Sequence, residues 1–313
     1  MKQRTLKHEV IFEGIGVHSG SVSCIVLKPA PKDFGIVFTN PLFPDNSFKI
    51  GSVIPEVAMQ ATVLKNDKWV LSTTEHLLAA ILGVGLDNVL IQVAGPEHHQ
   101  AHQLVEIPIM DGSAAPFVHG ILDCGLQEQD ADKKYLTPKQ ILKFEDAKSG
   151  RVIEIHPAEK IASQTNLAGT NSVETNISRD YSTDLYLSYT ADFAHKLVGN
   201  SQLDCLLTQE FFANEIAPAR TFGFLEQLPQ MRKLGIAKGT SLGNTVVLSN
   251  DGFLNETRFE DECVRHKVLD LIGDLSLLGF PLAGKVIAAK TGHSFNREVV
   301  NHYISNSDQW LVV

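Results

Sequence analysis

The sequence lacks the features of membrane, secreted and nucleic-acid-binding proteins. No stretch approaches the roughly 20 apolar residues that a transmembrane helix needs. The first residues, MKQRTLKHEVIFEG, are basic without the apolar run of a signal peptide. Four cysteines are scattered without a CxxC pair, which is typical of reduced thiols in the cytoplasm. The net charge of −9 is not offset by any basic stretch, which leaves room for a local phosphate pocket but argues against a nucleic-acid partner.

The length and composition predict a cytoplasmic globular protein of two domains. The 313 residues are enough for two sizeable cores, and the hydrophobic content of 43% and charged content of 20% are ordinary for such proteins. The polar stretch QEQDADKKYLTPK is typical of a linker. We therefore expect an N-terminal domain at 1–128, a linker at 129–133 and a C-terminal domain at 134–313.

Each half alternates expected strands with expected helices, without an internal sequence repeat. The strands are predicted at 6–12, 21–27, 88–93, 140–144, 151–156, 184–193 and 285–289. The helices are predicted from Ser72 to before Gly83, at 113–123, at 208–216, within the Leu-, Ile- and Val-rich segment 225–247, and at 259–279.

The last of these, FEDECVRHKVLDLIGDLSLLG at 259–279, ends in a glycine, which most readily takes the left-handed turn at a helix end. Within it His266 and Asp270 are four residues apart, so both side chains lie on one helical face and reach one point in space. This spacing suits a divalent metal ion. Asp274 lies one turn further along, and Lys267 is next to the pair.

Two interpretations of this pair are open. An apolar stripe lies roughly opposite it, by the helical repeat of about 100° per residue, and consists of Val264, Val268, Leu271, Leu275 and Leu278. Behind such a stripe, the pair would be an ordinary solvated ion pair. However, its own face also carries Phe259, Cys263, Gly273 and Leu277 rather than a mixture of Lys and Glu, which suits a cleft better than open water.

The stretch LSTTEHLL is the start of another expected helix. Ser72 is a good N-cap, and Glu75 fits the capping box, in which a glutamate three residues later bonds back to the cap amide. His76 is then one more residue of the first turn. From this segment alone, capping explains Glu75 better than catalysis does.

Three irregular segments carry weaker signals. His18 lies in the glycine-rich turn GIGVHSG, and a lone loop histidine is usually a surface residue. A second loop holds His98, His99 and His102, which we expect to be solvated and to which we assign no role. Residues 161–183 are rich in Ser, Thr and Asn without periodicity, which predicts a long mobile insertion of open function.

Several of these residues together match the needs of amide hydrolysis at neutral pH. That reaction needs an activated water, a general base, an acid for the leaving amine and a group that holds the oxyanion. A catalytic zinc ion usually takes three protein ligands and leaves its fourth position to water. The chain offers His76, His266 and Asp270 as ligands, Glu75 as the base, and His293, in the turn KTGHSFN, as the acid.

The motifs GIGVHSG, STTEHL, EIPIMDGSAAPF, ARTFGF, FEDECVRHKVLDLIGDL and KTGHSFN, in this order, resemble those of the zinc-dependent UDP-3-O-acyl-N-acetylglucosamine deacetylases. This family performs the committed step of lipid A synthesis in Gram-negative bacteria. The resemblance spans nearly the whole chain. It implies an α+β fold of two similar two-layer α/β domains, each a small sheet with two helices, whose helix layers face each other with the site between them. It also favours a monomer.

The resemblance implies a role for each catalytic residue. One catalytic Zn²⁺ per chain would be held by His76, His266 and Asp270. Glu75 would be the general base, and His293, oriented by Asp274, would protonate the leaving amine. Thr221 would help to polarise the acetamide carbonyl, and Lys267 would place positive charge near the oxyanion.

It also implies contacts to the UDP-acyl-sugar substrate. Phe222 and His18 would help to position it, and the segment 225–247 would form a passage for the fatty acyl chain, whose length preference depends on how that passage closes. The uridine and diphosphate contacts would be Asp192, Phe193, Lys290 and Arg151, the last replacing a lysine of relatives. Gln60 stands near the position at which some family members carry a cysteine at the cleft edge. A second, inhibitory zinc ion is therefore expected to bind less readily to this chain.

Two other functions compete with this hypothesis. One is a non-catalytic protein that binds a nucleotide sugar or an acyl lipid on the same fold, although binding alone does not require Glu75, Thr221 and His293. The other is a zinc deacetylase of a different sugar, which would not need an acyl passage at 225–247.

Overall fold

The computed structural model describes residues 1–58, 60–94, 104–160 and 181–313. The histidines His98, His99 and His102 and most of the expected insertion at 161–183 lie outside the described residues. No described helix is long and apolar enough to cross a lipid bilayer.

The first half of the chain forms a five-stranded sheet covered on one face by two helices. Its strands, in spatial order, are β2 (Val10–Ile15), β3 (Val22–Pro29), β9 (Val89–Ala94), β4 (Ile36–Thr39) and β5 (Phe48–Lys49). Only β9 and β4 pair in parallel, and the other neighbours are antiparallel. The helices are α1 (Glu75–Gly83) and α2 (Ala115–Cys124).

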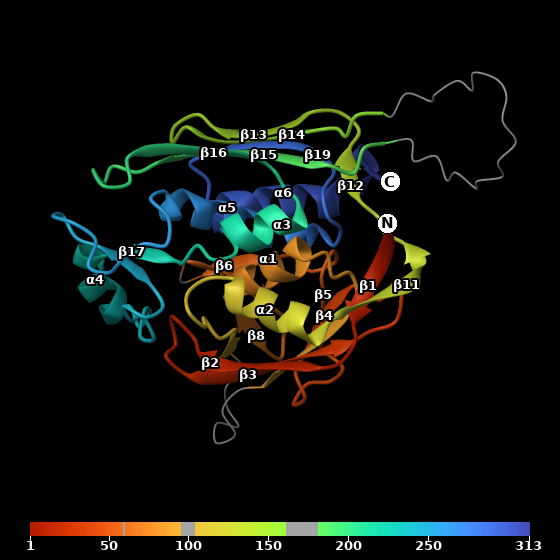
Figure 1. The fold of residues 1–313 in the computed structure, drawn as a ribbon, viewed down its shortest axis with the longest axis horizontal. Helices are drawn as coiled ribbons and strands as arrows, with labels where there is room; N and C mark the ends of the chain where they lie inside the picture. Colours follow the sequence, from red (N-terminus) through yellow and green to blue (C-terminus); the bar gives the residue numbers. More distant parts are fainter. Residues whose placement is uncertain (59, 95–103, 161–180) are drawn as a thin grey trace, which may run out of the picture.

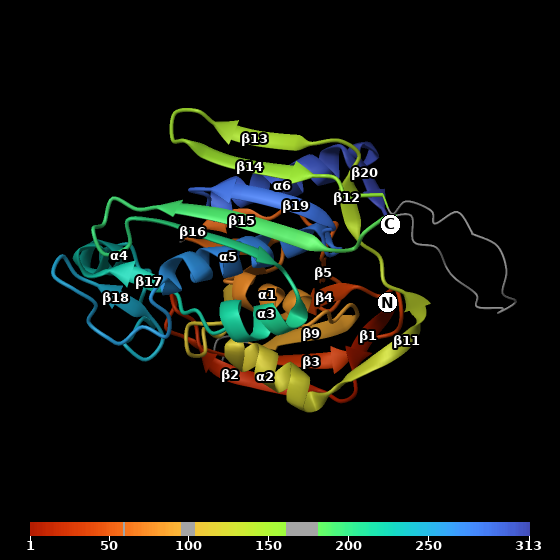
Figure 2. The ribbon, with the colours of Figure 1, turned by 45° about the horizontal axis from the view of Figure 1, so that its top comes forward.

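The second half repeats this arrangement without repeating the sequence. Its sheet has the order β13 (Leu142–Asp146), β14 (Arg151–His156), β19 (Gly284–Ala289), β15 (Leu185–Asp192) and β16 (Asn200–Leu206). Again one pair, β19 with β15, is parallel and the rest are antiparallel. Its helices are α5 (Glu262–Leu275) and α6 (His293–Ser305) (Figure 2). In both halves the last strand therefore inserts between the second and the third.

The two sheets are the outer layers of the molecule, and the helices lie between them (Figure 1). Strand side chains alternate between the two faces, so one face of each sheet can pack on the helices. In β15, for example, Leu187, Tyr189 and Ala191 are buried and the residues between them are more exposed. This arrangement confirms the predicted α+β fold with facing helix layers.

The central contact of the fold is between α1 and α5, one helix from each half. A Cβ atom on Gly273 would lie 2.1 Å from the Glu75 carbonyl oxygen, so only glycine permits this approach of the helices. The helix α5 confirms the expected one, although it begins at Glu262 rather than Phe259. A 3₁₀ turn, Ser276–Leu278, then leads to Gly279, whose φ of 85° is left-handed as expected.

Smaller elements connect or extend the two layers. A four-stranded sheet has the order β10 (Leu104–Glu106), β8 (Val70–Ser72), β7 (Ala61–Lys65) and β6 (Glu56–Ala58). Three two-stranded pairs are β1 (Lys2–Leu6) with β11 (Leu126–Asp132), β12 (Leu136–Pro138) with β20 (Trp310–Val312), and β17 (Phe222–Phe224) with β18 (Val246–Leu248). The remaining helical turns are α3 (Gln209–Phe211), a π turn (Phe212–Ile216), α4 (Leu228–Lys233), and 3₁₀ turns at Leu225–Gln227 and Ser307–Gln309.

Several local expectations are confirmed and others are corrected. The Thr208 hydroxyl caps the helical turn after it by accepting from Phe211 N–H at 3.0 Å. The segment 225–247 holds a helix and leads into a strand, as expected. The polar stretch at 127–139, where a linker is expected, holds most of β11, which pairs with β1, and then β12. The sequence patterns predict neither β16 nor α6.

Candidate active site

The start of α1 places Glu75 and His76 toward α5, and the predicted capping box is wrong. Ser72 is the last residue of β8, the N-cap is Thr74, and no side chain caps this helix. The carboxylate of Glu75 instead accepts a hydrogen bond from the backbone N–H of Thr62 at 3.2 Å. Both Glu75 and His76 are buried. The glutamate is therefore free of the local role that the sequence favoured.

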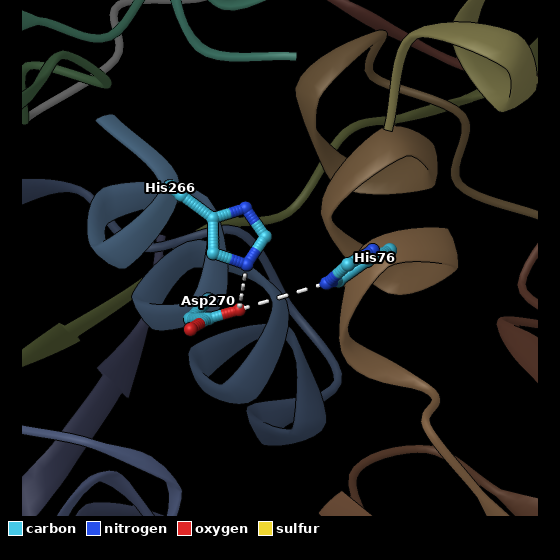
Figure 3. A group of neighbouring side chains, drawn as sticks. All are labelled: His76, His266 and Asp270. Atoms are coloured by element: carbon cyan, nitrogen blue, oxygen red, sulfur yellow. Dashed lines mark ion pairs between the residues drawn. The ribbon is translucent and has the colours of Figure 1, made fainter. Parts of the chain in front are cut away.

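His76 meets the predicted pair of α5 across the junction of the two halves. Figure 3 shows His76 on α1 pointing at His266 and Asp270 on α5. The Nε2 atom of His76 lies 3.8 Å from Asp270 Oδ1, and His266 Nε2 lies 3.4 Å from the same oxygen. All three side chains are buried, with ligand atoms within 4.8 Å of one another. The solvated interpretation of the His266 and Asp270 pair is therefore wrong.

The donor set of these residues fits a zinc ion. Two ligands of one tetrahedral zinc at about 2.0–2.1 Å stand roughly 3.3 Å apart, which is close to the observed separations. The Nδ1–H of His266 donates to the Ala219 carbonyl at 3.0 Å, so its Nε2 lone pair faces the other two ligands. In contrast, the buried Nδ1 of His76 has no hydrogen-bond partner among the described residues.

The electrostatics of the cluster also favour a cation. Burial, reinforced by His266, lowers the pKa of His76 to about 3, and burial likewise lowers the pKa of His266. Burial alone would raise the pKa of Asp270, but Lys267 holds it well below its usual range, with Nζ at 2.6 Å from Asp270 Oδ2. Two neutral imidazoles and one carboxylate are a set that zinc prefers.

Glu75 and His293 face each other beside this cluster. His293 is the first residue of α6 rather than part of a free turn, and its Nε2 lies 3.9 Å from Glu75 Oε1. Burial raises the pKa of Glu75 to about 8, with His293 opposing the shift. Burial opposes the charge on His293, but Asp274, Asp270 and Glu75 together raise its pKa to about 10. The carboxylate is thus a strengthened base, and the imidazole is held protonated.

Asp274 anchors His293 from behind. Its Oδ2 accepts from His293 Nδ1 at 2.9 Å and from Asn296 Nδ2 at 2.7 Å, while its Oδ1 accepts from the Thr62 hydroxyl at 2.5 Å. Sequence reasoning missed both Thr62 and Asn296. Asn296 stands three residues after His293, a spacing that brings side chains together only on a helix, and the sequence predicts a turn there. Thr62 comes from a distant strand and carried no local signal.

A cavity of about 280 Å³ joins these groups to an apolar region. The reactive end is lined by Glu75, His76, Thr221, His266, Lys267, Asp270 and His293, with His18 and Gln60 nearby. The rest of the lining is mostly apolar and includes Phe193, Phe222, Phe224, Leu225, Leu228, Met231, Ala237 and Val247. The cavity therefore combines a polar reaction centre with space for a nonpolar chain, and most of its apolar wall comes from the segment 222–247.

The predicted substrate residues divide into two groups. Phe193 and Phe222 meet edge to face in the cavity, with ring centroids 5.4 Å apart, and His18 is buried there rather than exposed on a loop. Asp192 and Lys290 do not line the cavity but form an ion pair at 2.5 Å, with both side chains about 40% exposed (41% and 38%). Arg151 is exposed and lines a separate hollow on the surface.

Comparison with known proteins shows similarity along the whole chain. The family model described as UDP-3-O-acyl N-acetylglycosamine deacetylase matches residues 3–305. The UDP-3-O-acyl-N-acetylglucosamine deacetylase of Mannheimia succiniciproducens is 37% identical over 319 residues, which covers 100% of this chain and 93% of the relative. Those of Pasteurella multocida and Haemophilus influenzae (strain 86-028NP) are 36% and 35% identical with the same coverage.

Proposed function

This chain belongs to the UDP-3-O-acyl N-acetylglycosamine deacetylase family, and from that premise we propose that it is a zinc-dependent amidohydrolase of lipid A biosynthesis. Its substrate is UDP-3-O-(3-hydroxyacyl)-N-acetylglucosamine, and its products are the free amine and acetate. The observation that carries the proposal is the meeting of three histidines, two carboxylates and a lysine from both halves at the end of one partly apolar cavity.

One zinc ion per chain is held by His76, His266 and Asp270. The buried, neutral imidazoles and the anionic carboxylate described above support this assignment. Bound there, zinc supplies Lewis-acid chemistry, polarising the amide carbonyl and acidifying water. Lys267 pairs with Asp270. Burial alone would lower the pKa of Lys267, but the charge of Asp270 raises it, so Lys267 keeps its positive charge beside the metal ligands.

Glu75 and His293 move the two protons that the reaction requires. Glu75 takes a proton from the attacking water while the new C–O bond forms. His293 gives its proton to the amine nitrogen while the C–N bond breaks, and acetate leaves. Asp274 holds the His293 ring through Nδ1, which leaves Nε2 for the leaving group. The distance of 3.9 Å between Glu75 Oε1 and His293 Nε2 supports their action on the same amide group.

Thr221 and Phe222 place the acetamide against these groups. The backbone of Thr221 is fixed from both sides, since its N–H donates to the Gly112 carbonyl at 2.7 Å and its carbonyl accepts from Val246 N–H at 2.8 Å. The first of these bonds crosses between the halves of the chain. Thr221 is therefore held at the junction, where it helps to polarise the carbonyl.

The apolar end of the cavity takes the fatty acyl chain, and the segment 225–247 is its main wall. We also propose that Asp192, Phe193 and Arg151 bind the uridine and that Lys290 binds near the diphosphate. We further propose that the chain acts as a cytoplasmic monomer whose domains are 1–128 and 134–313, joined by 129–133.

Acetate release from the acylated substrate and from bare UDP-N-acetylglucosamine, each with and without a chelator, tests the function. We expect release that stops when zinc is removed and returns when it is restored, with a large preference for the acylated form. Equal rates on the two substrates would favour a deacetylase of a different sugar. Binding of the acylated substrate without acetate release would favour a non-catalytic protein.

A further inference from the structure

A buried carboxylate outside the reaction centre has no role in the mechanism above. Glu106 is the last residue of β10 and is 4% exposed. Among the described residues, no ion pair within 4.0 Å involves its side chain, and it does not line the cavity. Burying a carboxylate without a cation is costly unless hydrogen bonds stabilise it, so its contacts indicate what it does.

Glu106 organises the loop that carries His18. Its Oε1 accepts from the His18 N–H at 2.9 Å, and its Oε2 accepts from the Ser19 N–H at 2.8 Å. The loop wraps so closely that a Cβ atom on Gly16 would lie 2.1 Å from Oε2. His18 itself lines the reactive end of the cavity. The carboxylate therefore fixes the backbone from which the His18 side chain reaches the cavity.

The same carboxylate also contacts the start of α1. The Thr73 hydroxyl donates to Glu106 Oε1 at 3.0 Å. Thr73 has a φ of 60°, a left-handed conformation that is unfavourable for a β-branched residue and persists only when its surroundings stabilise it. Glu75 and His76 follow after Thr74. Glu106 thus stabilises the strained residue from which the base and one zinc ligand are presented.

The loop that carries His18 is also hydrogen-bonded to the segment 225–247, the wall of the acyl passage. The N–H of Lys238 donates to the His18 carbonyl at 3.1 Å, and the N–H of Gly239 donates to the Val17 carbonyl at 3.0 Å. The fit is close, because a Cβ atom on Gly239 would lie 2.2 Å from the Gly16 carbonyl oxygen. The passage segment 225–247 is therefore attached to the loop that Glu106 holds.

We propose that Glu106 is a positioning residue that sets His18 and the start of α1 at the reaction centre and couples both to the wall of the acyl passage. It acts through these segments without touching the substrate. The inference rests on the proposed function, because it predicts that Glu106 links the reaction to recognition of the acyl chain.

The variant Glu106→Gln tests this in the full-length, zinc-loaded protein. The variant keeps the size of the side chain but replaces one carboxylate oxygen, which accepts hydrogen bonds, with an NH₂ group, which donates them. That NH₂ group would face the donors of His18 and Thr73 or that of Ser19. We expect kcat/KM for the acylated substrate to fall roughly 10- to 100-fold, as for loss of hydrogen bonds to a charged group. Because the passage wall is also released, the preference for the acylated over the bare substrate should fall about tenfold, with zinc content unchanged.

Ser23→Ala is the matched control. The Ser23 hydroxyl donates to the backbone carbonyl of Glu106 at 2.6 Å, so this variant disturbs the same buried strand and leaves the carboxylate intact. We expect it to retain the acyl preference. A Glu106→Gln variant with normal kinetics, or one that loses rate equally on both substrates together with zinc, would overturn the positioning role. The same would follow if Ser23→Ala reproduced its kinetics.

Amide hydrogen exchange separates this inference from the proposed function, because it does not depend on turnover. In Glu106→Gln, exchange should accelerate at His18, Ser19, Lys238 and Gly239, and in Ser23→Ala it should not. Unchanged exchange at these amides in Glu106→Gln would contradict the inference whatever the activity. If the exchange pattern appears but the wild type releases no acetate, the proposed function fails while the structural role of Glu106 stands.

Discussion

Asp274→Asn removes a negative charge behind His293 without changing the shape of the side chain. In the wild type, burial works against the charge on His293, but Asp274 and its neighbours raise the pKa of that histidine to about 10. Because His293 acts as the acid, its protonated form is the active one. The acid function of His293 is therefore present below this pKa and is lost as the pH rises through it.

The magnitude follows from the distance of 2.9 Å between His293 Nδ1 and Asp274 Oδ2. An opposite charge this close shifts a pKa by about 1–3 units. The basic limb of the pH profile of kcat/KM in Asp274→Asn should therefore move about 1–3 pH units lower. The acidic limb should also move lower, because the charge of Asp274 helps to raise the pKa of Glu75. Zinc content, measured on the same samples, should not change.

Thr62→Val is the matched control for this prediction. It removes a hydrogen bond to Asp274 Oδ1 but leaves the carboxylate charge in place, so its basic limb should shift much less. If Asp274→Asn left the basic limb where it is in the wild type, His293 would not be the acid that limits the rate at high pH.

Three further predictions concern the base, the helix contact and the acyl passage. Glu75→Gln should lower kcat by about 10²–10⁴-fold with zinc still bound, and a near-normal rate of acetate release would exclude it as the base. Gly273→Ala forces a methyl group against the Glu75 carbonyl, so the free energy of unfolding of this variant in urea should fall by about 1–3 kcal/mol. In the control Gly252→Ala no atom lies near the added Cβ, so the free energy of unfolding should change little. Equal stability of the two variants would refute the close approach of α1 and α5. Leu228→Trp should shift the preference among acylated substrates to shorter chains, and an unchanged preference would place the acyl chain elsewhere.

The local pattern of α5 was sufficient to predict the helix but not its surroundings. Spacing placed His266 and Asp270 on one face, and Gly279 marked the end. That face is buried because α1, which lies nearly 200 residues earlier in the sequence, packs against it. The resemblance to a known family resolved this where periodicity did not.

The errors share a physical cause, which is that local patterns do not contain long-range partners. The capping box at Ser72 and Glu75 is a sound local motif, but the left-handed Thr73 breaks its register and Thr62 takes over the carboxylate. The strand β11 looks like a linker because most of its residues are polar and none is buried. The helix α6 was missed because it begins directly after Gly292 with polar residues, so it reads as a turn.

Zinc titration of the metal-free protein tests most directly whether two helices from different halves form one metal-dependent centre. The wild type should bind one ion tightly per chain and regain acetate release in proportion to the zinc bound. Both His76→Ala, on α1, and His266→Ala, on α5, should lose tight binding and activity together. Full acetate release by the metal-free wild type, or tight zinc binding that survives in either variant, would contradict the account.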